Sequence, residues 1–443
     1  MRFLPRPGLL REHDFRQLFV ADTISQLGSQ VSLLALPLVA VLALQASNFE
    51  VGALATCDTL AFLLIGLPAG AWVDRMRRRS VLIAGDLGRA VVLGSVPVAW
   101  WFDALTMPQL YVVGLLTGVL TVFFDVAYQS YLPHLVGRDN LVEGNAKLEV
   151  VRGVTQIGGP TAAGFVIQAL TAPVAVAVDA VSFAGSALFV GLIRKREELP
   201  ERKPDRHLGR EIMEGLRFVL RNRLLRSIAM CTSSSNLFSS ISGAMLIVLL
   251  ARTLHLGAGT IGLVFSLAAV GGLVGALVTD RVVKALGQGP AIWIASFMTG
   301  PFGLLIPLAQ RGWLLWAAAG CFAISWTFVV IYNVTQVSFR QGLTPEHLLG
   351  RMNATMRFLV WGTLPLGAFI GGVLGQLIEV RPTLWVGAIG GLLPFLAVFF
   401  SPLRHMRELP TRPDDDGTPH APGGGQVPPT ATLDAGAAES VPT

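Results

Sequence analysis

The feature that most constrains this chain is a series of long apolar runs, separated by short segments that carry most of the charge. Many runs reach about 18 residues or more with almost no charge, the length that a helix needs to cross roughly 30 Å of hydrocarbon. Charged residues make up only 14% of the 443 residues, against about 25% in soluble domains. Soluble enzymes and disulfide-rich secreted domains are therefore excluded, and an integral membrane protein is predicted.

Twelve runs are predicted to span the membrane as helices. In lipid every backbone polar group needs a partner within its own segment, and the alternating pattern of a membrane β-barrel is not visible, so the expected fold class is all-α. The first run is too long for a secretory signal, and no cleavage site follows it. The predicted spans are residues 15–45, 51–73, 80–102, 108–132, 145–170, 173–193, 226–251, 259–280, 289–310, 313–340, 351–378 and 382–402.

The distribution of Lys and Arg predicts the orientation, because positive residues stay on the cytoplasmic side of a membrane. Among the loops on the other side, the only basic residues are Arg252, Arg311 and Arg381. Both termini are therefore expected in the cytoplasm. Arginine greatly outnumbers lysine, which is typical of GC-rich bacteria and indicates a bacterial inner membrane. The net charge of +6 then needs no nucleic-acid partner.

The spans are expected to form two bundles of six helices, residues 1–193 and 226–402. A charged cytoplasmic connector at 194–225, with a surface helix at 208–223, divides them. Residues 403–443 are expected to form a cytoplasmic tail, disordered where Pro, Gly, Thr and Asp dominate from 411 onward.

No pattern for a cofactor, a metal or a catalytic centre stands out. The three cysteines lie singly in apolar segments, the seven histidines have no metal-ligand spacing, and no G-x-x-x-x-G-K-[ST], H-E-x-x-H or G-x-S-x-G motif occurs. The chain is therefore predicted to be no enzyme and to need no cofactor. It is expected to act as a monomer in the lipid bilayer.

Two unrelated markers reveal an internal repeat. Asn145-Ala146 after the fourth span matches Asn353-Ala354 after the tenth, at an offset of 208 residues. Asp74-Arg75 after the second span matches Asp280-Arg281 after the eighth, at an offset of 206. Two like-oriented halves imply a pseudo-two-fold axis along the membrane normal, and such halves can rock about a central site.

Asp74 and Arg75 of the second marker lie in a longer motif. Residues 70–79, Gly-Ala-Trp-Val-Asp-Arg-Met-Arg-Arg-Arg, resemble the G-x-x-x-D-R-x-x-R-R loop of the Major Facilitator Superfamily, with a weaker echo at 275–287. The resemblance covers about residues 1–402. Gly158-Gly159-Pro160 and Gly164 resemble the Gly-Pro helix motif associated with antiporters of that superfamily. Phe124-Asp125 and Asp179 fit the layout of its twelve-span macrolide and siderophore exporters. Span four lacks the embedded arginine of many drug exporters, so their proton relay is not transferred.

Both motifs are candidates for gating. An Asp at a helix end can accept N–H groups of a neighbouring helix while arginines hold carboxylates or lipid phosphates. A cluster that only fixes topology would explain the arginines but not the Asp and the Gly. The Gly-Pro segment permits a bend and close helix approach, whether for packing alone or for gating. The gating candidates are Gly70, Asp74, Arg75, Arg78, Gly159, Pro160, Gly164, Asp280 and Arg281.

Ionisable residues inside spans are costly and mark a cavity or a pair. Asp86 and Arg89 are spaced i, i+3 and can pair, which leaves Arg152 for Asp22 or Asp125. The remaining carboxylate, in a low-dielectric cavity, favours its neutral form and is a candidate proton carrier. Spans one and four line the cavity in the resembled family, so Asp22 or Asp125 is the candidate; the alternative is a fixed polar network. Asp58 and Asp179 lie nearer the outer ends, as an outer gate or in water.

The second half has only Arg357 as a clearly embedded charge, so any coupling is expected in the first half. Polar and aromatic residues that are candidates for binding an amphipathic solute, or for packing alone, are Tyr128, Asn236, Trp326, Tyr332, Asn333, Gln336 and Trp361. The resemblance implies a secondary transporter that exports an amphipathic small molecule (a drug, a macrolide or a siderophore) in exchange for protons. Uptake of a metabolite and a non-transporting sensor are the alternatives.

Overall fold

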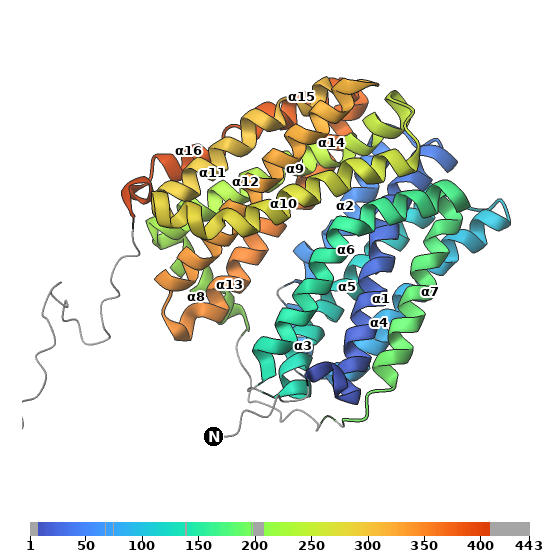
Figure 1. Cartoon of the computed structure of the whole chain (residues 1–443), viewed down its shortest axis with the longest axis horizontal. Coiled ribbons are helices and arrows are strands. Elements are labelled where there is room, and N and C mark those ends of the chain that lie inside the picture. Colours follow the sequence, from blue (N-terminus) through green and yellow to red (C-terminus); the bar gives the residue numbers. More distant parts are fainter. Residues whose placement is uncertain are drawn as a thin grey trace, which may run out of the picture. The chain divides into compact units, whose positions relative to one another are not determined.

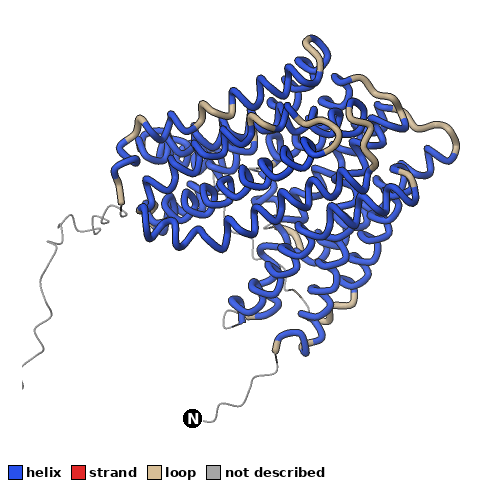
Figure 2. The backbone as a smooth tube through the Cα atoms, turned by 45° about the horizontal axis from the view of Figure 1, so that its top comes forward, coloured by secondary structure: helices blue, strands red, loops and turns tan. Residues whose placement is uncertain are grey.

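In the computed structural model, regular structure in the described part of the chain is entirely helical (Figure 2). The structure describes residues 8–66, 68–73, 75–137, 140–195, 197 and 208–407. Asp74, residues 196 and 198–207 of the connector, and residues 408–443, which are most of the predicted tail, lie outside this range. Residues 402–405 form a 3₁₀ turn, and the backbone of Met406 and Arg407 accepts hydrogen bonds from the start of α11. A tail beginning at 403 is therefore a wrong prediction for these first residues.

The first half contains seven helices within the described residues (Figure 1). They are α1 (His13–Leu38, extended by a π-helical turn Val39–Ala43), α2 (Asn48–Ile65), α3 (Pro68–Val73), α4 (Arg78–Trp101), α5 (Met107–Val136), α6 (Leu141–Leu170) and α7 (Ala172–Gly191). The single predicted span 51–73 is thus two helices. α2 ends at Ile65, shortly before Pro68, whose ring nitrogen cannot continue a helical hydrogen-bond ladder.

The second half repeats this plan. It contains α9 (Arg223–Val248, extended by the π-helical turn Leu249–Thr253), α10 (Ala258–Leu286), α11 (Gln288–Gly303), α12 (Trp313–Leu343), α13 (Glu346–Trp361), α14 (Thr363–Leu377), α15 (Val380–Gly390) and α16 (Phe395–Phe399). The predicted spans 351–378 and 382–402 are each broken, at Gly362 and around Gly391–Pro394. Between the halves, α8 (Leu208–Arg221) confirms the predicted surface helix.

Eleven helical stretches of the described residues are long and apolar enough to cross a membrane. α6 is the one predicted span not among these eleven, residues 145–170: it has 30 residues and packs beside α1 and α10. Its composition is more polar, because Glu143, Lys147 and Glu149 occupy its first turns and two glutamines follow. The twelve-helix fold is confirmed, and its polar member is the helix that carries the Gly-Pro motif.

The backbone conformation shows the internal repeat more clearly than the amino-acid sequence does. The π-helical turns begin at Val39 and Leu249, 210 residues apart. Residues with positive φ that are not glycine follow in both halves, Gln45 with φ of 51° and His255 with φ of 47°. Thr171 (φ 74°) and Glu379 (φ 69°) form a second such pair. A side chain at positive φ is uncommon, so its recurrence at equivalent positions confirms that the halves are two copies of one fold.

Within each half one helix order recurs. In the first half α7 packs against α1 and α4, α6 against α1, and α5 against α2 and α4. At the equivalent places in the second half α15 packs against α9, α16 against α11, α14 against α9, and α12 against α10 and α11. The halves meet mainly along two helix pairs, α2 with α14 and α6 with α10 (Figure 1). We call the end where α1 and α9 begin the basic face, and the end with loops 44–47, 102–106, 171, 254–257, 304–312 and 378–379 the opposite face.

Candidate transport site

Three helices of the first half enclose a polar cavity of about 330 Å³. Asp22 and Gln26 come from α1, Tyr128 comes from α5, and α6 contributes the rest of the lining, Asn145, Ala146, Leu148, Glu149 and Arg152. Asp22 lies in the second turn after Phe15, a fully buried anchor of α1. The rise of about 1.5 Å per residue places Asp22 roughly 13 Å from the start of α1. The cavity therefore lies at hydrocarbon depth, on the side of the basic face.

A chain of hydrogen bonds begins at Asp22. The amide nitrogen of Gln26 donates to Asp22 Oδ2 at 2.7 Å, and the hydroxyl of Thr155 donates to Gln26 Oε1 at 3.3 Å. The i, i+4 spacing puts both α1 residues on the face that meets α6. The side chain of Tyr128 lies in the same cavity beside Asp22. Asp22 is only 8% exposed, so this carboxyl group is held by polar neighbours rather than by water.

Arg152 pairs with Glu149 rather than directly with Asp22 or Asp125. Its guanidinium nitrogen lies 3.6 Å from Glu149 Oε2, and both side chains are more than half exposed. The expectation that Arg152 serves Asp22 or Asp125 is thus wrong as a direct ion pair, although its charge still acts on both. The sequence analysis did not predict Glu149 as a partner of Arg152. The i, i+3 spacing of the two residues on one helix could have indicated the pair.

Asp86 and Arg89 form the buried ion pair that their spacing predicts, at 2.5 Å on α4. The guanidinium of Arg89 lies between two aromatic rings, 4.3 Å from the centre of Phe124 and 4.1 Å from the centre of Phe183. Such stacking on both faces stabilises a desolvated cation. The pair joins α4 to α5 and α7, so it packs inside the first bundle rather than in the cavity.

Cations of both halves act on Asp125. It is partly buried on α5, and the charges that act on it are those of Arg89, Arg357 and Arg152. Arg357 belongs to α13, and its guanidinium lies over the ring of Trp361 at 4.9 Å. Trp361 in turn packs edge-on against Phe62 of α2, with 4.9 Å between ring centres. Arg357 and Trp361 thus lie on α13, which contacts α2 of the first half, and the charge of Arg357 acts on Asp125.

The other predicted binding residues lie in different surroundings. Asn236 donates to the carbonyl of Val360 at 3.0 Å, inside the α9 and α13 contact. Tyr332 is buried, and its hydroxyl lies 2.6 Å from that of Thr232. Gln336 is also buried, whereas Asn333 is exposed and Trp326, which is 39% exposed, packs beside Phe322. In this conformation Tyr332 and Gln336 therefore pack in the protein core, which is the alternative to binding a solute.

The two outer carboxylates differ from each other. Asp179 is buried, and its carboxylate accepts a hydrogen bond from Ser182 at 2.9 Å, so the expectation that it meets water is wrong. It fills the α1 and α7 contact, where a side chain at Gly28 would collide with Ser182. Asp58 is exposed on α2.

The predicted gating residues at the basic face make their described contacts within one half. Arg78 lies 3.6 Å from Glu197, whose other oxygen accepts the backbone N–H of Arg79. Asp280 pairs with Lys284 at 2.6 Å, and Arg75 and Arg281 are exposed. A side chain at Gly70 would meet nothing within 4 Å. Asp74 lies outside the described residues. The arginines do hold a carboxylate, as expected, but these contacts do not latch the two halves together here.

The halves instead close at the opposite face. There α2 meets α14 so tightly that a Cβ at Gly52 would lie 2.3 Å from the Cα of Gly372. On the other side, a Cβ at Gly164 of α6 would lie 2.4 Å from the carbonyl oxygen of Ala258. Thr161 donates its hydroxyl to Ser266 at 2.7 Å across the same seam. These contacts have no room for larger residues.

The residues of the Gly-Pro motif lie in three different surroundings, and only two of them contact the seam. Gly164 and the backbone of Pro160 contact α10, where a Cβ at Gly262 would lie 2.2 Å from the carbonyl oxygen of Pro160. Gly159 instead faces α1, where a Cβ would lie 2.4 Å from Gln30. Gly158 has open space around it. α6 remains one continuous helix, so close approach rather than a break is what these residues provide.

Arg252 adds a polar contact to the closed end. Its guanidinium donates to the carbonyl oxygens of Ala46 and Val41 and to Asn48 Oδ1, all in the first half, and the amide of Asn48 donates to Gly375 of the second. Arg311 and Arg381 likewise donate to backbone carbonyls, but within the second half. The sequence analysis counted Arg252 only as one of three basic residues in the loops of the opposite face. Because basic residues are rare on that face, its presence there was a signal of a specific contact.

Two repeated six-span bundles, closed at one end and carrying charged side chains in a cavity, define a secondary transporter of the Major Facilitator type. The chain belongs to the transmembrane secretion effector family of that superfamily, whose sequence pattern matches residues 7–421. It is therefore a multi-pass membrane protein of a transporter family and not an enzyme.

Relatives match over most of the chain. It is 26% identical to the enterobactin exporter EntS of Citrobacter koseri over 420 residues, which cover 92% of this chain and 97% of that protein. It is 27% identical to the multidrug efflux pump Tap of Mycolicibacterium fortuitum, over 89% of this chain and 97% of the relative. A bacterial homologue of the iron transporter ferroportin in an inward-facing state shares the fold, with a TM-score of 0.72, 18% identity, and coverage of 89% and 99%.

Proposed function

We propose that the protein exports an amphipathic small molecule from the cytoplasm by exchange for protons. The observation that carries this proposal is the cavity in which Asp22, a largely desolvated carboxyl group, shares its lining with exposed charged residues of α6. A group that can bind and release a proton beside a solute site is what coupled exchange needs. The export activity named for EntS and Tap supports the direction of transport.

The conformation suits loading from the cytoplasm. Contacts between the halves gather at the opposite face, through Gly52, Gly164 and Arg252. The basic face carries nearly all the positive charge, so the positive-inside rule assigns it, and both termini, to the cytoplasm. In alternating access the bundles 1–193 and 226–402 rock, and the loops at Gly70–Arg79 and Asp280–Arg281 close the basic face in the other state. The protein works as a monomer in this scheme.

Coupling rests on the carboxylates of the first half. Asp22 and Asp125 are the proton carriers, with Arg152 and Arg357 as the cations that stabilise them when charged. A solute that binds at Trp361 and Tyr128 displaces the proton, and a proton that binds displaces the solute. The exchange follows because the solute and the proton compete for one electrostatic site. A proton moving down the membrane potential supplies about 2.3 kcal/mol per 100 mV, which drives accumulation outside.

The experiment uses inside-out vesicles with an acidified interior and two probes, ethidium and enterobactin. Wild-type protein is expected to accumulate at least one probe, and Asp22→Asn and Asp125→Asn each to reduce proton-driven accumulation at least tenfold. Asp103→Asn is the matched control, because Asp103 is exposed in an opposite-face loop at φ of 52°, a conformation that Asn adopts well. Full activity in both cavity variants contradicts the coupling proposal.

The same vesicles separate the alternatives. An importer of a metabolite accumulates no probe in inside-out vesicles but takes up its solute in right-side-out vesicles with an acidic exterior. A non-transporting sensor moves nothing in either orientation.

A further inference from the structure

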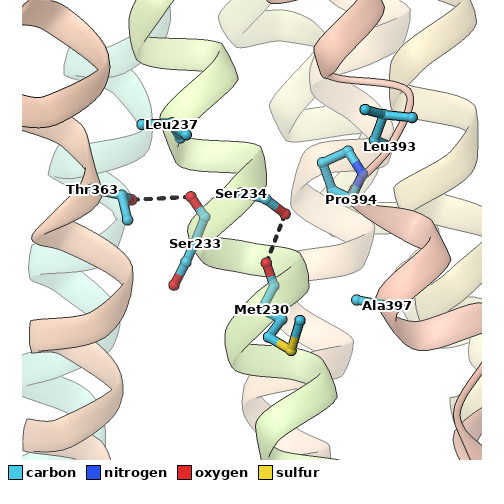
Figure 3. A pocket seen from close by; sticks show the side chains of 8 residues that line it. All are labelled: Met230, Ser233, Ser234, Leu237, Thr363, Leu393, Pro394 and Ala397. Atoms are coloured by element: carbon cyan, nitrogen blue, oxygen red, sulfur yellow. Dashed lines mark hydrogen bonds between the residues drawn. The ribbon is translucent and has the colours of Figure 1, made fainter. Parts of the chain in front are cut away.

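A lateral groove of about 460 Å³ lies in the second half, outside the candidate transport site (Figure 3). Its floor is one face of α9, with Met230, Ser233, Ser234 and Leu237. α14 forms one wall, and the break between α15 and α16, at Leu393 and Pro394, forms the other. Met230 is 59% exposed and Leu393 is 54% exposed, so the groove is open along its length.

The groove faces away from the seam between the halves. α14 uses its other side to contact α2 of the first half, where Gly372 meets Gly52. α9 turns Thr232 and Cys231 inward, toward Tyr332 of α12 and Ser296 of α11. The open side therefore meets the surrounding bilayer and not the transport pathway.

The floor presents an apolar surface despite its hydroxyl groups. Ser234 donates to the carbonyl of Met230 at 2.6 Å, and Ser233 donates to that of Leu359 at 3.0 Å. Thr363 donates to the carbonyl of Ser233 at 3.0 Å (Figure 3). Because every hydroxyl on the floor is already bonded to backbone, the groove offers small, satisfied groups against which a hydrocarbon chain can pack.

The two halves of the repeat differ in sequence and helix continuity at the position of this groove. The offset of 210 residues between the π-helical turns pairs Ser234 with Ile24 of α1. In the first half α7 is unbroken from Ala172 to Gly191, and Ile24 Cγ2 lies 3.9 Å from where a Cβ on Gly185 would be. In the second half Ser234 replaces the larger Ile24, and the break between α15 and α16 replaces the continuous α7. The space beside α9 is therefore left open.

Positive charge lies at the basic-face end of the same helix face. Arg223 and Arg226 are exposed and precede Met230 by seven and four residues, so they align with the groove floor at helical spacing. From Arg226 to Leu237 the rise of α9 is roughly 16 Å, close to half of a hydrocarbon core of about 30 Å. The groove thus has the length of one leaflet and a cationic end at the level of its headgroups.

We propose that the groove binds an anionic phospholipid of the basic-face leaflet, with one acyl chain between α14 and α15–α16 and the phosphate at Arg223 and Arg226. This site is independent of the transport proposal, since it shares no residue with the cavity around Asp22. A bound phospholipid accounts for three features that share one face of α9. These are the hydroxyl groups already bonded to backbone, the open space beside α15 and α16, and the two arginines.

The test is native mass spectrometry of the delipidated full-length protein titrated with phosphatidylglycerol, phosphatidylethanolamine or glycerol phosphate. Wild type is expected to retain one phosphatidylglycerol at least tenfold more tightly than phosphatidylethanolamine. Ser234→Ile, which copies the first half, should lower retention of both lipids at least fivefold. The double variant Arg223→Gln with Arg226→Gln should abolish the preference for phosphatidylglycerol while phosphatidylethanolamine binding remains.

Matched controls separate these effects from general damage. Ser338→Ile places the same side chain at another exposed helical serine that bonds to the carbonyl four residues earlier, and Arg217→Gln removes an exposed arginine of α8. Both should retain phosphatidylglycerol like wild type. If Ser234→Ile does not fold, Leu393→Trp fills the groove from its other wall. Equal retention in all variants overturns the proposal, and so does displacement of the lipid by glycerol phosphate alone.

Discussion

Arg252 of the second half donates a hydrogen bond to the carbonyl oxygen of Ala46 in the first half, at 2.5 Å. Ala46 lies directly after Gln45, a residue held at φ of 51°. One charged side chain therefore fixes a strained turn of the opposite bundle and holds the two halves together where they close. The equivalent position in the first half is Leu42, so the contact is made once and not twice.

Removing this contact should shift the protein toward opening at the opposite face. Arg252→Ala loses charge-assisted hydrogen bonds worth roughly 1.5–3 kcal/mol each, and about 1.4 kcal/mol already changes a population ratio tenfold. Distances between spin labels on α2 and α14 at that end should lengthen in a larger fraction of molecules. Arg311→Ala, which loses bonds only within the second half, should leave the distribution unchanged; a shift of equal size there would contradict the role of Arg252.

Enlarging the α2 and α14 contact should prevent closure of the same end. Gly52→Val puts side-chain atoms where a Cβ alone would lie 2.3 Å from Gly372, and backbone cannot yield as a flexible side chain does. Impermeant thiol reagents should then label cysteines placed at the opposite face at least tenfold faster. Gly153→Ala is the control, because its added methyl group meets nothing within 4 Å. Unchanged labelling of Gly52→Val would show that the seam is not the closed gate.

The buried pair on α4 should matter for stability. Arg89→Ala leaves Asp86 without its partner and removes the stacking on Phe124 and Phe183, and breaking a buried ion pair costs about 3–5 kcal/mol. The melting temperature in detergent should fall strongly. Arg89→Lys should also lose stability, since an ammonium does not stack like a planar guanidinium. Arg75→Ala, at an exposed position, should melt like wild type.

Two aromatic candidates should separate binding from packing. Trp361 lies between Arg357 and Phe62, so Trp361→Ala is expected to weaken probe binding at least tenfold in a fluorescence titration. Tyr332→Phe removes a buried hydroxyl that bonds to Thr232. Such a bond is worth about 1 kcal/mol of stability, and its loss should leave the affinity unchanged. A loss of affinity with Tyr332→Phe would place that residue in the binding site after all.

Apolar length and the asymmetry of arginine determined most of the architecture from the sequence alone. Runs such as 313–340 must be helices in lipid because no other segment satisfies its own backbone, and the recurrence of Asn145-Ala146 at Asn353-Ala354 revealed the repeat. The pair of Asp86 with Arg89 also followed from spacing, because both partners lie on one helix. Properties that depend on period, length or i, i+3 neighbours are local, and local order can be read along a chain.

The tertiary structure decided what depends on packing between helices. It enclosed Tyr332 in the core of the second half and brought Arg252 to Ala46 across 206 residues. Neither arrangement is indicated by the residues beside it in the sequence. Both exist because helices far apart in the sequence pack closely, at contacts such as Gly52 with Gly372 that leave no room for a larger side chain.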